Sequence, residues 1–416
     1  MAAGRPPLGD GGLFDDEAPE EAVLATLADQ RAIQRAPIKD VAVLRRLGEG
    51  AYAYVDLVAI GGAAPKLCAG KLLCPPPPEA APAPPAGAAA AAAAAPCALA
   101  RWTAAAAAAR GPIKPTPPSM FAKQKAAYAR CAGSPFVVQL LAAKSGRGGH
   151  MLLLLEWAEH GSLADRLLPD TPQHHGTLQQ PEPSCDGDEG GDADDGGGGA
   201  DWCDCGGGGG DGGACGDCLR LYAPAAPPPA RSGGGGGGGG VPEAAARFYA
   251  GCALLALEYM HARAMVHRDV KPDNLLLFSC GYLKLSDLGA CCVVPPGHAP
   301  TTRTGTAAYM APEVKAARPQ CSAADMWSLG VTVWELVAGR LPGWAGDEAG
   351  HGGGLEFPPH FSRELQSLLS RLLSRDPAAR PCAEATQAAG WFSGFDWDAL
   401  RERRMAPPPV PGGALA

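Results

Sequence analysis

The chain has 416 residues and a formal net charge of -8, and a large share of its 57 glycines and 42 prolines lies in homopolymeric runs. Such runs bury too little apolar surface to offset the entropy of ordering, so we expect a single bilobal-sized domain rather than two or three domains. The acidic balance, without a basic stripe, argues against a nucleic-acid-binding protein.

The fifteen cysteines are scattered and mostly stand beside apolar residues, as reduced thiols do in intracellular proteins. The start of the chain lacks the apolar core of a signal peptide, and Ala2 occupies the place where myristoylation needs glycine. The alanine-rich run near residues 86–109 contains Pro96 and Arg101 and is too weakly hydrophobic for a membrane span. We therefore expect a soluble intracellular protein without a membrane partner.

The pattern of residues 41–60 predicts two strands joined by a glycine turn, after an acidic tail. Gly48 and Gly50 allow backbone amides to approach phosphates closely, and Val55 would cover a purine ring. A plain hairpin turn is the alternative, because Gly-x-Gly is a weak signal in so glycine-rich a chain. Lys71, embedded in an apolar strand, would pair with phosphates; a surface lysine on an edge strand is the alternative there.

Two low-complexity segments, 75–118 and 169–240, are predicted to be insertions. The second contains four cysteines whose spacing could supply thiolates to zinc, namely Cys203, Cys205, Cys215 and Cys218. We favour an acidic loop without metal, because a structural zinc site normally has a packed shell around it. Between the insertions, residues 120–131 have helix-forming composition, and the apolar run 151–155 predicts a buried strand.

A long amphipathic helix predicted over residues 242–261 leads to the stretch that carries the most chemistry. Asp269 can accept a hydroxyl proton, and Lys271 can neutralise phosphate charge. Asn274 and Asp287 offer the oxygen ligands that Mg²⁺ prefers. This combination predicts phosphotransfer.

The C-terminal part contains three further signals. This part of the chain resembles the corresponding part of protein kinases, and the resemblance implies that Thr306 hydrogen-bonds Asp269 and Lys271 and that Glu313 forms a buried ion pair with Arg380. Asp325, at the start of an apolar helix, would brace the backbone of the catalytic stretch. We expect these last three residues to be structural.

These motifs, in this order, resemble a eukaryotic-type protein kinase. Arg247-Phe-Tyr, Gly281-Tyr-Leu-Lys-Leu and the run from Trp391 to Leu400 resemble the AGC group, closest to the cGMP- and cAMP-dependent kinases. The resemblance implies an α+β, bilobal fold with a small β-rich N-lobe and a larger, mainly helical C-lobe. The kinase domain would cover residues 41–395, between an N-terminal tail, 1–40, and a short C-terminal tail, 396–416.

The resemblance also implies the site. ATP would be the phosphoryl donor and Mg²⁺ the metal, with Ser or Thr of protein substrates as acceptor. The implied nucleotide-binding residues are Leu47, Gly48, Glu49, Gly50, Val55, Ala69, Lys71, Glu156 and Ala158. The implied catalytic residues are Asp269, Lys271, Lys71 and Thr306, and the metal ligands are Asn274 and Asp287.

Regulation and substrate choice follow from the same resemblance. Thr302 would be a phosphosite for an upstream activating kinase, and Arg268 would pair with its phosphate. Asp273 and Glu335 match positions that read substrate arginines, which implies basic residues near the acceptor. Two other acidic positions of that group are Ser162 and Ala308 here, which weakens the expected basic preference.

The sequence departs from the kinase pattern at four places, and two of them, the missing carboxylate partner for Lys71 and the tail without a docking motif, motivate a rival hypothesis. There is no carboxylate between Glu79 and Glu156, and Lys125 stands where a helix glutamate should pair with Lys71. Leu288 replaces a phenylalanine, Cys292 replaces a phosphate-binding lysine, and the tail lacks an aromatic docking motif. The alternative is a pseudokinase that acts as a scaffold.

Overall fold

We describe the protein from a computed structural model, which describes residues 33–34, 41–49, 53–60, 66–73, 118–145, 151–167, 240–295, 297–343 and 355–410. These residues belong to two compact units. The first takes in residues up to 125 and residues 139–157, and the second takes in residues 126–138 and 158 onward. The four cysteines considered for zinc lie outside the described residues.

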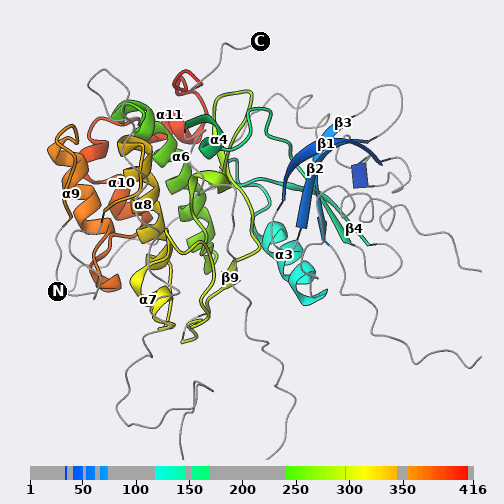
Figure 1. Cartoon of the computed structure of the whole chain (residues 1–416), viewed down its shortest axis with the longest axis horizontal. Coiled ribbons are helices and arrows are strands. Elements are labelled where there is room, and N and C mark those ends of the chain that lie inside the picture. Colours follow the sequence, from blue (N-terminus) through cyan, green and yellow to red (C-terminus); the bar gives the residue numbers. More distant parts are fainter. Residues whose placement is uncertain are drawn as a thin grey trace, which may run out of the picture. The chain divides into compact units, whose positions relative to one another are not determined.

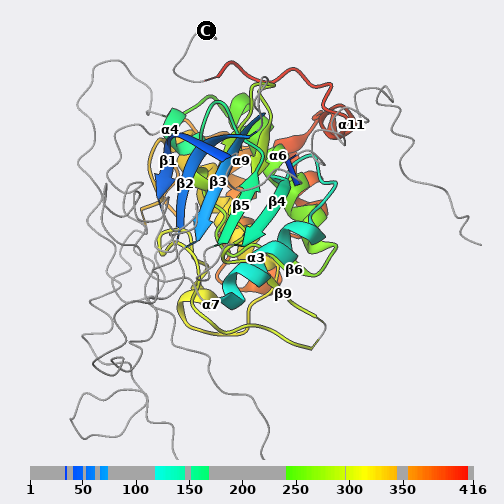
Figure 2. The same cartoon turned by 90° about the vertical axis from the view of Figure 1, so that its right-hand side faces the viewer.

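The first unit is a five-stranded antiparallel sheet in the order β1-β2-β3-β5-β4, seen face-on in Figure 2. Its strands are β1 (Val41–Glu49), β2 (Ala53–Ile60), β3 (Lys66–Leu73), β4 (Leu140–Ser145) and β5 (Met151–Leu155). Every residue of β5 is buried, as its continuous apolar run predicts. Strand β1 lies at the edge, where Val43 and Leu44 are exposed.

One face of this sheet forms the core of the unit. Tyr54, Val58, Cys68, Leu72 and Leu152 alternate along β2, β3 and β5 and pack in one cluster. Because successive side chains of a strand point to opposite faces, the residues between them in sequence, Lys71 among them, belong to the other face.

The second unit is mainly helical, so the α+β class expected from the sequence is confirmed. Helix α3 (Pro118–Arg130) begins in the first unit and ends in this one. The other helices are α4 (Leu163–Leu167), α6 (Glu243–His261), α7 (Pro312–Lys315), α8 (Ala323–Ala338), α9 (Arg363–Leu372), α10 (Ala383–Gln387) and α11 (Trp397–Arg401). Short strands complete it: β6 (Met265–Val266), β7 (Leu275–Leu277), β8 (Leu283–Leu285) and β9 (Cys292–Val293).

Helices α6 and α8 pack side by side at the centre of this unit (Figure 1). Each residue of α8 from Ala324 to Ala338 is buried, as expected of a core helix, and its buried polar side chains are Asp325, Ser328, Thr332 and Glu335. The helix ends at Gly339, which has a left-handed backbone (φ 67°) and donates its amide hydrogen bond to the Glu335 carbonyl. The described residues include no helix with the length and apolar character that crossing a bilayer requires.

Glu243, in the first turn of α6, holds three parts of this unit together. Its carboxylate accepts bonds from the Ser362 amide (2.7 Å) and hydroxyl (2.7 Å) at the start of α9. It also accepts a bond from the indole of Trp391 at 2.9 Å. Ser362 in turn caps α9 by accepting the Leu365 amide.

The ion pair expected between Glu313 and Arg380 is present. The two guanidinium nitrogens of Arg380 bind the two carboxylate oxygens of Glu313 at 2.6 and 2.8 Å. The Arg380 side chain is completely buried and also donates to the carbonyls of Ser374 and Ala323. The pair therefore joins α7 to the segment before α10 in a site without solvent.

We expect Arg380→Ala to lower the free energy of unfolding by about 3–5 kcal/mol, because Glu313 would keep an unpaired charge in a buried site. The matched control is Arg401→Ala. That side chain is 43% exposed and lies 3.7 Å from Glu258, so its loss should cost less than about 1 kcal/mol. Urea unfolding of both variants measures the difference. Equal losses would contradict the structural role of the pair.

Candidate active site

The segment between β6 and β7 is braced by the buried carboxylate of Asp325, as its place before an apolar helix predicted. Asp325 is completely buried and accepts the backbone amides of His267 (2.8 Å) and Arg268 (2.7 Å). It also contacts His261 of α6 at 2.8 Å. The brace is needed because Arg268 has a left-handed backbone (φ 67°), which is unfavourable for a residue with a side chain.

Burial by itself would raise the pKa of Asp325, because it penalises the charged form. The hydrogen bond and charge of His261 and the interactions of His267 outweigh this effect, and the pKa is lowered. The carboxylate is therefore held ionised inside the second unit.

His267 is fully buried and joins the two sides of the site. Its Nδ1 accepts the Asp269 amide at 3.2 Å, so Nε2 carries the proton and donates to the Ser286 carbonyl at 2.9 Å. The sequence analysis did not assign His267 a role. The available sequence signal for such a role was the position of His267 two residues before Asp269.

The Asp269 carboxylate is surrounded by donors. One oxygen accepts the amide and the hydroxyl of Thr306, both at 2.8 Å, and the other accepts the Asn274 side-chain amide at 3.0 Å. Lys271 donates to the Thr306 hydroxyl at 2.6 Å, and its Nζ lies 3.6 Å from the second carboxylate oxygen. The bonds expected of Thr306 with both residues are thus present.

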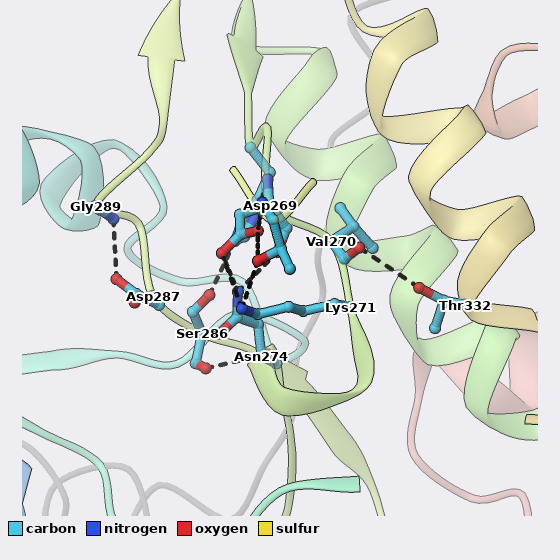
Figure 3. A network of polar contacts seen from close by, with 10 residues as sticks. Asp269, Val270, Lys271, Asn274, Ser286, Asp287, Gly289 and Thr332 are labelled. Carbon is cyan, nitrogen blue, oxygen red and sulfur yellow. Dashed lines mark hydrogen bonds and ion pairs between the residues drawn. The ribbon is translucent and has the colours of Figure 1, made fainter. Parts of the chain in front are cut away.

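Ser286 fixes the position of Asp287 relative to Asn274, because it precedes Asp287 in the chain and hydrogen-bonds Asn274. The Ser286 amide and hydroxyl donate to the Asn274 carbonyl at 2.8 and 3.0 Å, and Asp287 follows directly. Figure 3 shows Asp269, Lys271 and Asn274 together, with Asp287 on the adjoining segment. The Asp287 carboxylate accepts the Gly289 amide at 3.1 Å.

The donor set fits Mg²⁺. Hard oxygen ligands from one or two protein side chains, completed by phosphate oxygens and water, are what this ion takes. Asn274 uses its amide nitrogen on Asp269, which leaves the amide oxygen for a ligand. Among the described residues no three His, Cys, Asp or Glu side chains gather to hold a metal by themselves. Asn274 and Asp287 would therefore share the metal with a phosphorylated substrate.

The segment 301–306 lies directly against the Asp269 loop. A Cβ on Gly305 (φ 112°) would stand 2.2 Å from the Arg268 carbonyl oxygen, so only glycine fits. The Arg268 guanidinium donates to the Thr302 hydroxyl at 2.9 Å and to the Ala290 carbonyl at 2.6 Å. The structure thus brings together the two residues predicted to form a phosphate switch.

The two predicted substrate-reading carboxylates differ in their surroundings. Glu335 is only 2% exposed and accepts the Tyr309 hydroxyl, and burial followed by the Glu335 charge raises the pKa of Tyr309. Asp273 lies in the 3-10 turn Pro272–Asn274 and is half-buried. Tyr309 was not singled out from the sequence.

In the first unit, three of the predicted nucleotide-binding residues, Val55, Ala69 and Lys71, lie on one face of the sheet. Val55 lies directly across from Lys71 in the β2–β3 pair, and Ala69 is two residues along the same strand. Leu47 and Gly48 lie in β1, with Leu47 37% exposed.

The remaining nucleotide-binding candidates are dispersed. Glu156 exchanges backbone and side-chain bonds with Gln139 at the end of β5. Ala158 is buried in the second unit, where its carbonyl accepts the Gly161 amide. The backbone of Glu49 lies in β1, while its side chain and Gly50 lie outside the described residues.

The position assigned to the missing helix glutamate needs correction. Lys125 is exposed, whereas Gln124 is 2% exposed and shares the buried face of α3 with Ala127, Tyr128 and Cys131. That face follows the 3, 4, 7 spacing of a helix, which was visible in the sequence. The Gln124 amide oxygen has no hydrogen-bond partner among the residues that the structure describes. The buried side of α3 at this point therefore carries the neutral amide of Gln124 and not the charge of Lys125.

Comparisons with known proteins agree with the site. Residues 237–392 match the family model described as "Protein kinase domain". The 3-phosphoinositide-dependent protein kinase 1 of Arabidopsis thaliana is 35% identical over 189 residues, which are 40% of this chain and 38% of that protein. The cAMP-dependent protein kinase type 3 of Saccharomyces cerevisiae is 35% identical over 180 residues, which are 41% of this chain and 45% of that protein.

A third relative, the RAC-beta serine/threonine-protein kinase B of Xenopus laevis, is 37% identical over 177 residues, covering 39% of this chain and 36% of that protein. The chain spans less than half the length of each of these relatives. The matched part of this chain contains every residue discussed above for the Asp269 loop and the segment 301–306.

The lowered pKa of Asp325 predicts a pH dependence. A carboxylate with a folded pKa below its unfolded value of about 3.9 stabilises the fold fully above that value, and this stabilisation is lost as pH falls through the folded pKa. We expect Asp325→Asn to be less stable at pH 7 by about 3 kcal/mol, since the amide cannot satisfy both backbone amides and His261. Its stability should also fall less than that of the wild type between pH 5 and pH 2.

Urea unfolding across this pH range measures both effects. Asp398→Asn, which alters an 84% exposed carboxylate, is the control and should follow the wild type. If the stability of Asp325→Asn fell with pH as steeply as that of the wild type, the proposal that Asp325 braces the loop as an ionised carboxylate would be contradicted.

Proposed function

We propose that this protein transfers the γ-phosphoryl group of ATP to Ser or Thr side chains of protein substrates, because residues 237–392 match a protein kinase domain model and the similar proteins are named as protein kinases. The observation that carries this proposal is the hydrogen-bonded set around the Asp269 carboxylate. A scaffold without catalysis has no chemical need for it.

In the proposed step, the substrate hydroxyl oxygen attacks the γ-phosphorus, the bond to the β–γ bridging oxygen breaks, and ADP leaves with those electrons. Asp269 orients the hydroxyl and accepts its proton. The donors from Thr306 and Asn274 hold the carboxylate in one orientation, so little reorganisation is needed when the substrate binds.

Lys271 supplies positive charge next to the base. Its Nζ is fixed by the Thr306 hydroxyl, from which it can reach a transferring phosphoryl group while lying 3.6 Å from Asp269. Asn274 and Asp287 would hold Mg²⁺, which when bound neutralises developing phosphate charge. Lysine two residues after the base is typical of serine/threonine kinases, and we assign that acceptor class.

The sheet of the first unit supports the nucleotide role of Val55, Ala69 and Lys71, because all three lie on the same face. We propose that Leu47, Gly48, Glu49 and Gly50 cover the phosphates and that Glu156 and Ala158 hold the adenine edge. On this proposal the domain runs from residue 41 to 395 and extends beyond the matched range, 237–392, at both ends.

We assign Asp273 and Glu335 to recognition of basic residues near the acceptor. Glu335 is buried and bound to Tyr309, so reading an arginine would require that bond to open. An upstream kinase is proposed to modify Thr302. An intracellular site is supported by the described cysteines, which are all free thiols.

Asp269→Asn tests the reaction. We expect the rate of phosphate transfer from radioactive ATP to a basic peptide to fall about 10²–10⁴-fold, because asparagine cannot accept the proton. Asp398→Asn, an exposed carboxylate, should leave the rate unchanged. ATP binding should persist in both variants. Equal rates for wild type and Asp269→Asn would favour the scaffold hypothesis instead.

Thr302→Ala tests the switch. After treatment with an activating kinase, we expect the wild type to be about ten- to a hundredfold more active than the variant, since a phosphate on Thr302 would form charge-assisted bonds with Arg268. The neighbouring exposed Thr301, changed to alanine, is the control. Mass spectrometry identifies the modified residue, and modification confined to Thr301 would exclude Thr302 as the switch.

A further inference from the structure

The buried side chain of Gln320 contacts the segment that contains the proposed phosphosite. We propose that Gln320 is a positioning residue for Thr302: it holds the backbone of residues 300–302 so that the Thr302 hydroxyl faces Arg268. The proposal rests on the proposed function for the role of Thr302 as a phosphosite. The effect of Gln320 on the segment can be measured in a protein that transfers no phosphate.

The segment around Thr302 needs support from outside. Residues 298–304 form no helix or strand, so no backbone ladder fixes their position. The Arg268 guanidinium donates to the Thr302 hydroxyl at 2.9 Å, but the Thr302 side chain is exposed. A bond to an exposed hydroxyl competes with water and stabilises a conformation only modestly. A second restraint is therefore required to keep Thr302 opposite Arg268.

Gln320 supplies this restraint at two points. Its backbone amide donates to the Pro300 carbonyl at 3.0 Å. Its side-chain amide donates to the Thr302 carbonyl at 2.8 Å. The peptide before Thr301 and the peptide after Thr302 are thus both fixed. With the backbone held on both sides, the Thr302 side chain keeps its direction toward Arg268.

Gln320 can act as a support because its own loop, between α7 and α8, is anchored. The Arg318 amide donates to the Glu313 carbonyl at 2.9 Å, before Gln320 in the chain. After it, the Ala323 carbonyl accepts a bond from the Arg380 guanidinium at 2.9 Å. Both anchors belong to the buried ion pair of Glu313 with Arg380. The support for Thr302 therefore extends from the interior of the second unit.

The burial of Gln320 indicates a role beyond filling space. The residue is only 1% exposed, and its amide oxygen has no hydrogen-bond partner among the residues that the structure describes. An amide buried with an unpaired oxygen is costly compared with an apolar side chain of similar size. The bond from the amide nitrogen to Thr302 gives a physical reason for a glutamine at this position.

This restraint would strengthen the contact between a phosphate on Thr302 and Arg268. When two groups are already held in the bound arrangement, less of their interaction energy is spent on ordering the chain. Without the Gln320 side-chain bond, the phosphate would be detached from Arg268 for a larger fraction of the time. It would then be more accessible to a phosphatase.

Gln320→Met tests the restraint, because methionine is unbranched like glutamine, has a similar size and donates no hydrogen bond. We expect the initial rate of trypsin cleavage after the exposed Arg303, followed by mass spectrometry on the native full chain, to rise about 3–10-fold. The control is Gln366→Met, since Gln366 donates an equivalent bond to the Phe361 carbonyl at 2.9 Å, at the start of α9. It should leave this rate unchanged.

A second variant, Gln320→Glu, keeps the polarity and size of the side chain but has no N–H group for the Thr302 carbonyl. We expect the same increase in cleavage after Arg303, so the test does not depend on how well methionine packs. Thermal unfolding verifies that each variant is folded before its cleavage is compared.

The link to the switch is tested on protein treated with an activating kinase. We expect a phosphatase to remove phosphate from Thr302 about 3–10-fold faster in Gln320→Met than in the wild type, with Gln366→Met unchanged. Equal phosphatase rates for the two methionine variants would overturn the positioning of Thr302.

Equal cleavage rates after Arg303 in wild type, Gln320→Met and Gln320→Glu would overturn the restraint itself. A wild type that is not modified at Thr302 would remove the proposed phosphosite and overturn the link to a switch. The cleavage rates would still decide whether Gln320 holds the segment, so failure of the proposed function and failure of this inference give different results.

Discussion

The buried carboxylate of Asp325 accepts two consecutive backbone amides, at His267 and Arg268, and the geometry of the site follows from this contact. Arg268 adopts a left-handed backbone that it would not keep alone. With that conformation imposed, the Arg268 side chain reaches Thr302, and Asp269 follows in the position where its carboxylate meets Thr306 and Asn274. A single buried charge in α8 thus sets the direction of two side chains, those of the proposed base Asp269 and of Arg268.

The loop around Asp269 and the segment 301–306 form one hydrogen-bonded structure. Thr306 links Asp269 to Lys271, and Gly305 lies so close to the Arg268 carbonyl that no other residue fits. Movement of the segment would therefore alter the donors of the proposed base. This coupling gives a physical route by which a charge on Thr302 could change the rate of phosphate transfer, because Arg268 and Asp269 are adjacent in the chain.

Two buried polar side chains lie on one stripe of helix α3. Its buried stripe places an amide at Gln124 and a phenol at Tyr128, and both have polar atoms without a partner in the described part of the chain. Buried polar atoms of this kind are costly, so a helix that retains two of them in one stripe is suited to binding groups that arrive with a ligand or a conformational change.

The sequence by itself determined the fold class, the order of the motifs and the identity of the proposed base, because those depend on short patterns of residue type. Hydrophobic runs predicted β5, α6 and α8, and local spacing related Asp269, Lys271 and Asn274. The ion pair of Glu313 with Arg380 and the bonds of Thr306 were also expected, from the family resemblance. The family pattern selected Lys125 as the residue facing Lys71, however, although the 3, 4, 7 spacing of the helix puts Gln124 and not Lys125 on the buried side.

Only the tertiary structure decided which side chains are buried and which groups they hydrogen-bond. It buried Gln124 and exposed Lys125, paired Glu335 with Tyr309, and gave His267 its two bonds. The physical reason is that burial and hydrogen-bond partners depend on distances between elements far apart in the chain, and those distances arise only when the elements pack.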